Sequence, residues 1–213
     1  MSKRTHEDAM LTKQRILDAA NKVFIAKGFE KASLSDIARE AQVTRGAIYW
    51  HFENKSDIFV ELLDTQSKST NLRTTLFAAA NPDSPDPLGL LHKWMTLMFD
   101  ENIDLIVSPA IVNICVTIMA ADEEDEARQR LVEFLKVRNL SLEAALRNAV
   151  ARHQLPVDLD VKIAATYLKA IVDGQFSMAY KLDDFFKPAY YLKMIDIAFA
   201  HLGELRQQPT AAY

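Results

Sequence analysis

The chain has 213 residues, of which 49% are apolar and 25% charged, a composition typical of a folded globular protein with room for a sizeable core. Its net charge of −4 argues against nonspecific coating of nucleic acid, and its one cysteine excludes an internal disulfide. No stretch approaches the roughly 18 consecutive apolar residues of a membrane span, and the N-terminus carries no apolar run of signal length. We therefore expect neither export nor membrane insertion, and a cytoplasmic protein.

Charge is distributed unevenly along the chain. Residues 1–55 carry ten Lys or Arg against seven Asp or Glu, a balance of +3, whereas the remaining residues carry 15 against 22, a balance of −7. This asymmetry favours an anion-facing module joined to an acidic body.

The N-terminal module is predicted to contain three helices. Apolar residues at helical spacing over 7–27 indicate the first. Ser33 and Asp36 have the spacing of a capping box, which opens a short second helix. Thr44 then caps a third helix, and the unit is complete by residue 52.

The rest of the chain is also predicted to be helical. A further capping box at Asn54 and Asp57 opens a long helix expected to run to about residue 80. Apolar spacing and proline breaks predict more helices over 88–103, 105–121, 124–153, 159–181 and 188–206. No segment alternates convincingly as a strand, so the expected fold class is all-α.

Two short helices joined by a turn of three or four residues are the geometry of a helix-turn-helix DNA reader. Gly46 lies in the first turn of the second of these helices, where glycine costs on the order of 1 kcal/mol relative to alanine. The missing side chain lets the backbone approach the wall of a DNA groove, and a helix N-terminus favours phosphate. Gly46 therefore indicates contact with DNA and not packing.

The outward side chains of this second helix suit DNA. Ile48 and Phe52 share an inward face, which leaves Arg45 free to donate to O6 and N7 of guanine and Ala47 to touch a thymine methyl group. Phosphate oxygens are the expected partners of Ser33, Thr44, Tyr49, His51 and Lys55, with Trp50 also directed outward.

Structural roles compete for several of these positions. Tyr49 and Trp50 are alternatively half-buried against the next helix, and His51 is alternatively a solvated surface histidine. Thr44 is a helix cap first. Lys55 at a helix start opposes the helix dipole, a penalty that a nearby phosphate would remove.

The segment from about Thr12 to Leu63, and most specifically SLSDIAREAQVTRGAIYWHFENKSDIF, resembles the N-terminal domain of the TetR/AcrR family of bacterial transcriptional repressors; TRGAIYWHF is most similar to its multidrug-efflux branch. The resemblance covers about a quarter of the chain. It implies an all-helical homodimer with a helix-turn-helix DNA-binding domain over 1–54 and an effector-binding and dimerisation domain over 55–213. By position it also implies phosphate contacts for Ser33, Thr44, Tyr49, His51 and Lys55, and approach to bases for Arg45, Gly46 and Ala47. Gln42 departs from the family pattern, which often has glycine there, so the turn is expected to need strain or a positive φ.

The C-terminal body offers candidates for an effector site. Methionine and aromatic side chains suit varied apolar ligands because they repack at low cost, although such stripes are also ordinary core. A buried amide needs a hydrogen-bond partner and would orient a ligand or satisfy a backbone carbonyl. The candidates are Trp94, Met95, Met98, Phe99, Phe134, Tyr167, Ile171 and Phe176 for the walls, and Gln66, Asn113 and Gln175 for orientation.

The helices predicted over 159–181 and 188–206 carry more apolar residues than surface helices need. In a symmetric dimer they would meet their mates as a four-helix bundle; burial within one subunit is the alternative. The acidic run over 122–126 is expected to be a solvated helix start, and the scattered histidines predict no metal site. No catalytic motif and no cofactor are indicated.

These observations predict a ligand-responsive repressor that binds a pseudo-palindromic operator in double-stranded DNA as a homodimer, controls a multidrug efflux operon and is released by apolar or cationic small molecules. One alternative keeps the DNA-binding mechanism but senses an endogenous metabolite or signalling molecule. A more remote alternative is a helical enzyme or interaction bundle.

Overall fold

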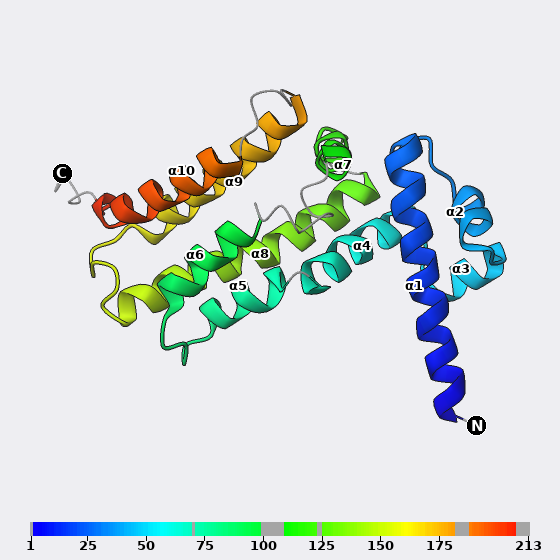
Figure 1. Cartoon of the computed structure of the whole chain (residues 1–213), viewed down its shortest axis with the longest axis horizontal. Helices are drawn as coiled ribbons and strands as arrows, with labels where there is room; N and C mark the ends of the chain where they lie inside the picture. The colour runs from blue at the N-terminus through cyan, green and yellow to red at the C-terminus, as the bar shows by residue number, and fades with distance from the viewer. Residues whose placement is uncertain (1, 70, 99–108, 123–124, 182–187, 208–213) are drawn as a thin grey trace. The chain divides into compact units, whose positions relative to one another are not determined.

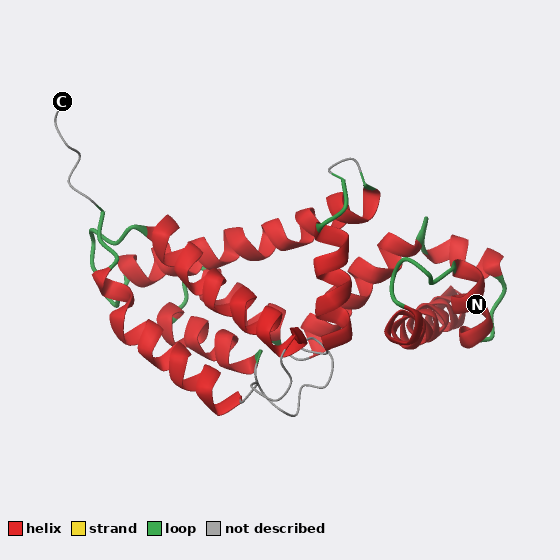
Figure 2. Ribbon diagram, turned by 90° about the horizontal axis from the view of Figure 1, so that it is seen from above, coloured by secondary structure: helices red, strands yellow, loops and turns green. Residues whose placement is uncertain are grey.

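The computed structural model describes residues 2–69, 71–98, 109–122, 125–181 and 188–207 (Figure 1). Within these ranges the chain forms helices joined by loops and no strand, apart from one isolated backbone bridge between Leu159 and Arg206 (Figure 2). The predicted all-α class is confirmed. The helices are α1 (Ser2–Lys27), α2 (Leu34–Ala41), α3 (Arg45–His51), α4 (Lys55–Ser69), α5 (Leu72–Ala80), α6 (Pro87–Leu97), α7 (Pro109–Met119), α8 (Glu126–Ala151), α9 (Val161–Lys181) and α10 (Pro188–His201), followed by the short 3-10 helix Leu202–Glu204.

The chain folds into two compact units. The first combines Met1–Gln66 with Ala110–Phe134, and the second combines Ser67–Pro109 with Leu135–Tyr213. Helices α7 and the start of α8 therefore pack with the N-terminal helices, although they lie far along the sequence.

An aromatic cluster holds the first unit together. The ring of Phe24 on α1 lies 5.5 Å from that of Phe29 and 5.7 Å from that of Phe59 on α4, and the rings of Phe29 and Phe59 are 5.6 Å apart. Such tilted and edge-to-face pairs add to the stabilisation from burial. The cluster joins α1, the turn after it and α4. Other buried residues of helices α1 to α4 and the link after α3 include Ile16, Leu17, Ala20, Ile37, Ala38, Ala41, Ile48, Phe52, Ile58 and Leu62.

The second unit has its own core. Helix α6 packs on α5, and α10 packs on α6 and α9. Fully buried residues include Leu91, Met95, Leu146, Leu168 and Ile195, with Trp94 and Val172 nearly so. These buried residues form one continuous cluster, to which each of these helices contributes its apolar side.

The structure corrects two predicted helices. The helix expected over 88–103 ends at Leu97, and residues 99–108, on which parts of two predicted helices fall, lie outside what the structure describes. Residues 54–80 do not form one long helix: α4 ends at Ser69 and α5 begins at Leu72. Asn71 has a φ of 59°, and a residue in this left-handed conformation cannot continue a right-handed helix. Helix α7 begins at Pro109, and proline is well tolerated in a first helical turn.

The compact units differ from the division expected at residues 54 and 55. Phe59 of α4 belongs to the aromatic cluster of the first unit, so α4 packs with α1 for part of its length. A division by function between DNA binding and effector binding at this point stays a prediction.

Candidate DNA-binding surface

Helix α2 begins at a complete capping box. The Ser33 hydroxyl accepts a hydrogen bond from the Asp36 amide (3.1 Å), and the Asp36 carboxylate accepts one from the Ser33 amide (3.3 Å). Asp36 also binds the Lys27 ammonium at 2.7 Å and the Arg39 guanidinium at 2.8 Å. The hydrogen bond from Lys27, followed by that from the Ser33 hydroxyl, lowers the pKa of Asp36 to about 2. Ser33 itself remains exposed.

The turn between α2 and α3 uses a positive φ, one of the two possibilities expected from the sequence. Gln42 has φ 54° and ψ 44°, and the Val43 amide donates to the Ala38 carbonyl at 3.0 Å. Arg15 of α1 closes the arrangement, because its guanidinium donates to the Ala41 carbonyl at 2.7 Å. Sequence reasoning did not identify Arg15. Its only signal was a basic residue on the polar side of the first helix.

Helix α3 is capped and anchored as predicted. The Thr44 hydroxyl accepts from the Ala47 amide at 3.1 Å. Ile48 is fully buried and Phe52 nearly so, which fixes the rotation of the helix about its axis. The opposite side of α3 is therefore presented to solvent.

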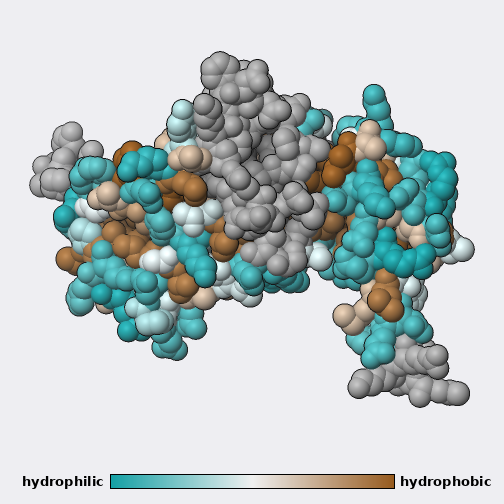
Figure 3. Space-filling model, viewed as in Figure 1, coloured by the Kyte–Doolittle hydropathy of each residue, from teal (hydrophilic) through white to brown (hydrophobic). Residues whose placement is uncertain are grey.

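Arg45, Gly46 and Tyr49 form the exposed side of α3. Tyr49 is 51% exposed, and the Arg45 guanidinium donates to its hydroxyl at 3.2 Å while lying 5.8 Å from its ring centroid. Ala47 is half-buried. Figure 3 shows hydrophilic residues over the face formed by α2 and α3.

Gly46 is not required by packing or by backbone conformation. A Cβ added there would meet only the Thr44 hydroxyl oxygen, at 3.7 Å, which is an ordinary contact. The fold therefore does not require glycine at this position. A close approach of another molecule to the backbone would explain the glycine, because any side chain would stand in the way.

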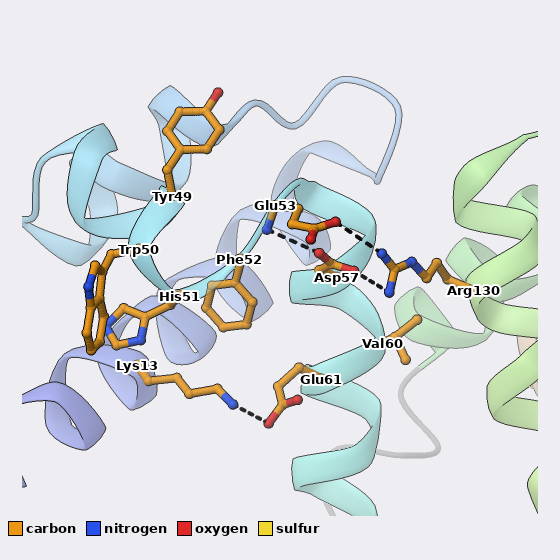
Figure 4. Close-up of a pocket in the computed structure, with 10 residues that line it drawn as sticks. All are labelled: Lys13, Tyr49, Trp50, His51, Phe52, Glu53, Asp57, Val60, Glu61 and Arg130. Carbon is orange, nitrogen blue, oxygen red and sulfur yellow. Dashed lines mark hydrogen bonds and ion pairs between the residues drawn. The ribbon is translucent and has the colours of Figure 1, made fainter. Parts of the chain in front are cut away.

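Trp50 and His51 differ in exposure. Trp50 is 72% exposed, so its side chain is not half-buried against α4. His51 is half-buried, and its ring meets that of Trp50 edge-on at 4.6 Å. Burial, followed by the charge of Lys13, lowers the pKa of His51, so the imidazole is neutral at pH 7. Both side chains border a hollow of about 480 Å³ behind α3, which Lys13, Phe52, Glu61 and Arg130 also line (Figure 4).

Lys55 has protein partners for its ammonium protons. Its Nζ donates to the carbonyls of Phe29 (2.8 Å), Glu30 (3.2 Å) and Ala32 (3.5 Å). An ammonium has three protons, so a phosphate would compete with these carbonyls.

The structure brings together some of the candidate effector residues. Trp94, Met95 and Met98 are buried in the core of the second unit, and Ile171 packs against that core. Tyr167 is exposed. Asn113 and Phe134 are half-buried and belong to the first unit. Phe99 and the side chains of Gln66, Gln175 and Phe176 lie outside what the structure describes.

Asn139 of α8 is a polar candidate that sequence reasoning missed. It lines a cavity of about 10 Å³, together with Trp94, Arg138, Leu142, Leu168, Lys169 and Val172. Its side-chain oxygen is buried and has no hydrogen-bond partner among the residues that the structure describes. An acceptor without a partner beside apolar side chains is suited to a hydrogen-bond donor, and a ligand larger than water would need the walls of this cavity to move apart. The sequence signal was one amide on the apolar side of a helix.

Helices α9 and α10 carry exposed apolar residues at helical spacing. Ile163 and Tyr167 lie one turn apart on α9, and Tyr190, Met194 and Ile197 follow one side of α10. Figure 3 shows apolar residues interspersed with hydrophilic ones over α10 and α6. Among the residues that the structure describes, no group of three or more His, Cys, Asp or Glu side chains is placed to hold a metal ion, and no helix is long and apolar enough to cross a membrane.

Comparison with known proteins decides the family. The family model for bacterial regulatory proteins of the tetR family matches residues 16–62, which contain the helix-turn-helix. The transcriptional regulator TtgR of Pseudomonas putida is 36% identical over 176 residues, which are 82% of this chain and 82% of TtgR. The chain belongs to the TetR family. It is therefore a helix-turn-helix transcriptional regulator, in a family whose members bind operators as dimers and respond to small molecules.

Two solved repressors have the same fold as this TetR-family regulator. SmeT, the repressor of the Stenotrophomonas maltophilia multidrug efflux pump SmeDEF, is 26% identical with a TM-score of 0.68, over 88% of each chain. A structure of SmeT in complex with triclosan also matches, at 27% identity and a TM-score of 0.63, covering 88% of this chain and 91% of SmeT. NalD, the secondary repressor of the MexAB-OprM multidrug efflux pump in Pseudomonas aeruginosa, is 26% identical with a TM-score of 0.66, over 92% of this chain and 96% of NalD.

Proposed function

We propose that this regulator represses an efflux operon and leaves its operator when a small apolar compound binds the second unit. The observation that carries the proposal is the exposed side of α3, where Arg45, Gly46 and Tyr49 face solvent on a helix fixed by the Thr44 cap and the buried Ile48. Repression of efflux pumps by SmeT and NalD supports the choice of target.

The proposed contacts divide between bases and phosphates. Arg45 leaves the Tyr49 hydroxyl and donates to O6 and N7 of a guanine, while Gly46 brings backbone close to the groove and Ala47 meets a thymine methyl group. Phosphate contacts are assigned to Ser33, Thr44, Tyr49 and His51, and Trp50 extends the surface beside them. For Lys55 we assign first the role of holding residues 29–32, because its protons are bound there.

The proposed dimer uses the exposed apolar residues of α9 and α10. Tyr190, Met194 and Ile197 on one side of α10, with Ile163 and Tyr167 on α9, would meet their copies across a twofold axis. Two half-sites then add affinity that one short recognition helix lacks.

The proposed effector is an apolar molecule with a hydrogen-bond donor. The cavity beside Asn139 enlarges on binding: Trp94, Leu142, Leu168 and Val172 move apart and supply apolar wall, and the unpaired oxygen of Asn139 accepts the donor. The triclosan complex of SmeT supports this class of compound. A hundredfold loss of operator affinity requires a ligand preference of about 2.7 kcal/mol for the conformation that does not bind the operator.

The test uses a duplex that the wild-type protein selects from a random-sequence pool and a random duplex of equal length. Arg45→Ala is expected to lose about 1–3 kcal/mol of discrimination between the two per half-site. Thermal melting with triclosan and with endogenous acyl compounds separates efflux control from metabolite sensing, because a bound ligand raises the melting temperature. If the wild-type protein selects no duplex, the proposal fails.

A further inference from the structure

The link between α3 and α4 is short and folded onto the start of α4. It contains Phe52, Glu53 and Asn54. The Glu53 amide donates to one carboxylate oxygen of Asp57 at 3.1 Å, and the Asp57 amide donates to the side-chain oxygen of Asn54 at 2.9 Å. Since Phe52 is buried, the direction in which α3 leaves α4 depends on this link.

Two residues of α8 form hydrogen bonds or ion pairs with the same link and with the start of α4. Arg130 lies 3.0 Å from Asp57 through one nitrogen and 3.4 Å from Glu53 through the other (Figure 4). One turn earlier on α8, the Glu126 carboxylate accepts a hydrogen bond from the Asn54 side chain at 2.6 Å. The sequence separation is 72 to 77 residues, so only the packing of the first unit brings these groups together.

The Arg130–Asp57 pair is the stronger part of this network. The Asp57 side chain is 16% exposed, whereas that of Glu53 is 81% exposed. Water screens an exposed pair far more than a partly buried one. Arg130 binds one oxygen of Asp57, and the other oxygen accepts the Glu53 amide. Without Arg130, the Asp57 carboxylate would lose this cation while still capping α4.

We propose that Arg130 is a positioning residue for operator recognition: by binding Asp57 and Glu53 together, it fixes the link that orients α3. It does so without touching DNA. This inference rests on the proposed function. It makes DNA recognition depend on a residue of α8 that belongs to neither the helix-turn-helix nor the effector cavity.

The experiment measures the affinities of Arg130→Gln for the selected duplex and for a random duplex at one salt concentration. We expect roughly a fivefold to tenfold loss on the selected duplex and less than about a twofold change on the random one, because orientation governs base contacts and charge governs nonspecific binding. The melting temperature should stay within a few degrees of wild type, since a partly exposed ion pair contributes little to stability. Arg130→Lys keeps the cation and should restore most of the loss.

A double-mutant cycle with Asp57→Asn tests whether Arg130 acts through Asp57. The asparagine oxygen can still accept the Glu53 amide, so this variant removes the ion pair and keeps the cap. The double variant Arg130→Gln, Asp57→Asn should bind the selected duplex no more weakly than Arg130→Gln alone. Arg147→Gln is the matched control, because Arg147 lies on the same helix and pairs only with Glu143, one turn away, among the contacts seen here.

Two outcomes would overturn the inference. Either Arg130→Gln binds both duplexes as wild type does, or it loses the same factor on both, which would make Arg130 a phosphate contact or a general stability residue. If the wild-type protein selects no duplex, it is the proposed function that fails, and the two failures are thereby distinguished.

Discussion

The ammonium of Lys55 lies 4.5 Å from the centroid of the Phe29 ring and donates a hydrogen bond to the Phe29 carbonyl at 2.8 Å. Lys55 is the first residue of α4, and Phe29 belongs to the turn that follows α1. One side chain therefore ties the start of α4 to the segment that leads into the helix-turn-helix.

Lys55→Met should destabilise the protein. The substitution keeps the length of the side chain but removes the Lys55 donor from the part-buried carbonyls of Phe29 and Ala32, and only the Phe29 carbonyl keeps a second donor, the Ala32 amide, so the cost is about 1–3 kcal/mol. Thermal or urea unfolding measures this loss. Arg45→Ala, on the exposed side of α3, should unfold like wild type and serves as the comparison. Unchanged stability together with a smaller salt dependence of DNA binding would instead identify Lys55 as a phosphate contact.

Gly46→Ala should change stability and operator affinity in opposite directions. The added Cβ has room, so the helix should gain about 0.5–1 kcal/mol and melt a few degrees higher. The same methyl group would stand between the backbone and the DNA, and operator affinity should fall. Calorimetry and a binding titration measure the two effects. A variant that gains both stability and affinity would show that the backbone at Gly46 does not approach the groove.

Operator binding should strengthen as the pH falls from about 8 to about 6. His51 has its pKa lowered by burial and is neutral in the free protein, while a nearby phosphate favours the protonated ring, so binding DNA takes up a proton. The free protein changes in the other direction: the unfolded chain protonates first, and stability declines below about pH 6.5. His51→Gln should remove this part of the pH dependence of binding. An identical pH profile in the variant would exclude His51 as a phosphate contact.

Asn139→Leu should stabilise the protein and impair its response to ligand. Replacing the buried oxygen that lacks a partner removes a cost of about 1 kcal/mol, so the melting temperature should rise. The rise in melting temperature on adding triclosan should then shrink. Asn148→Leu on the same helix is the control: its amide donates to the Ala79 carbonyl, so its loss should lower stability and leave the triclosan response intact. A full triclosan response in Asn139→Leu would remove Asn139 from the site.

Local chemistry explains most of what the sequence predicted. The Ser33–Asp36 box, the Thr44 cap and the left-handed Gln42 all involve residues within a few positions of each other, so their geometry follows from the helix ends themselves. The inward pair Ile48 and Phe52 follows from helical spacing in the same way. The end of α4 at Ser69 was missed because Asn71 tolerates both helical and left-handed conformations, and nothing local chooses between them.

The amino-acid sequence by itself determined the all-α class, the helix-turn-helix and the residues on the outer side of α3, because helical periodicity and capping act over one or two turns. Only the tertiary structure decided what holds that surface in place. Arg15 reaches the end of α2, Lys55 reaches residues 29–32, and Arg130 reaches Asp57. Each of these cations could have faced solvent on its own helix, and only the packing of distant helices brought an acceptor within hydrogen-bonding distance.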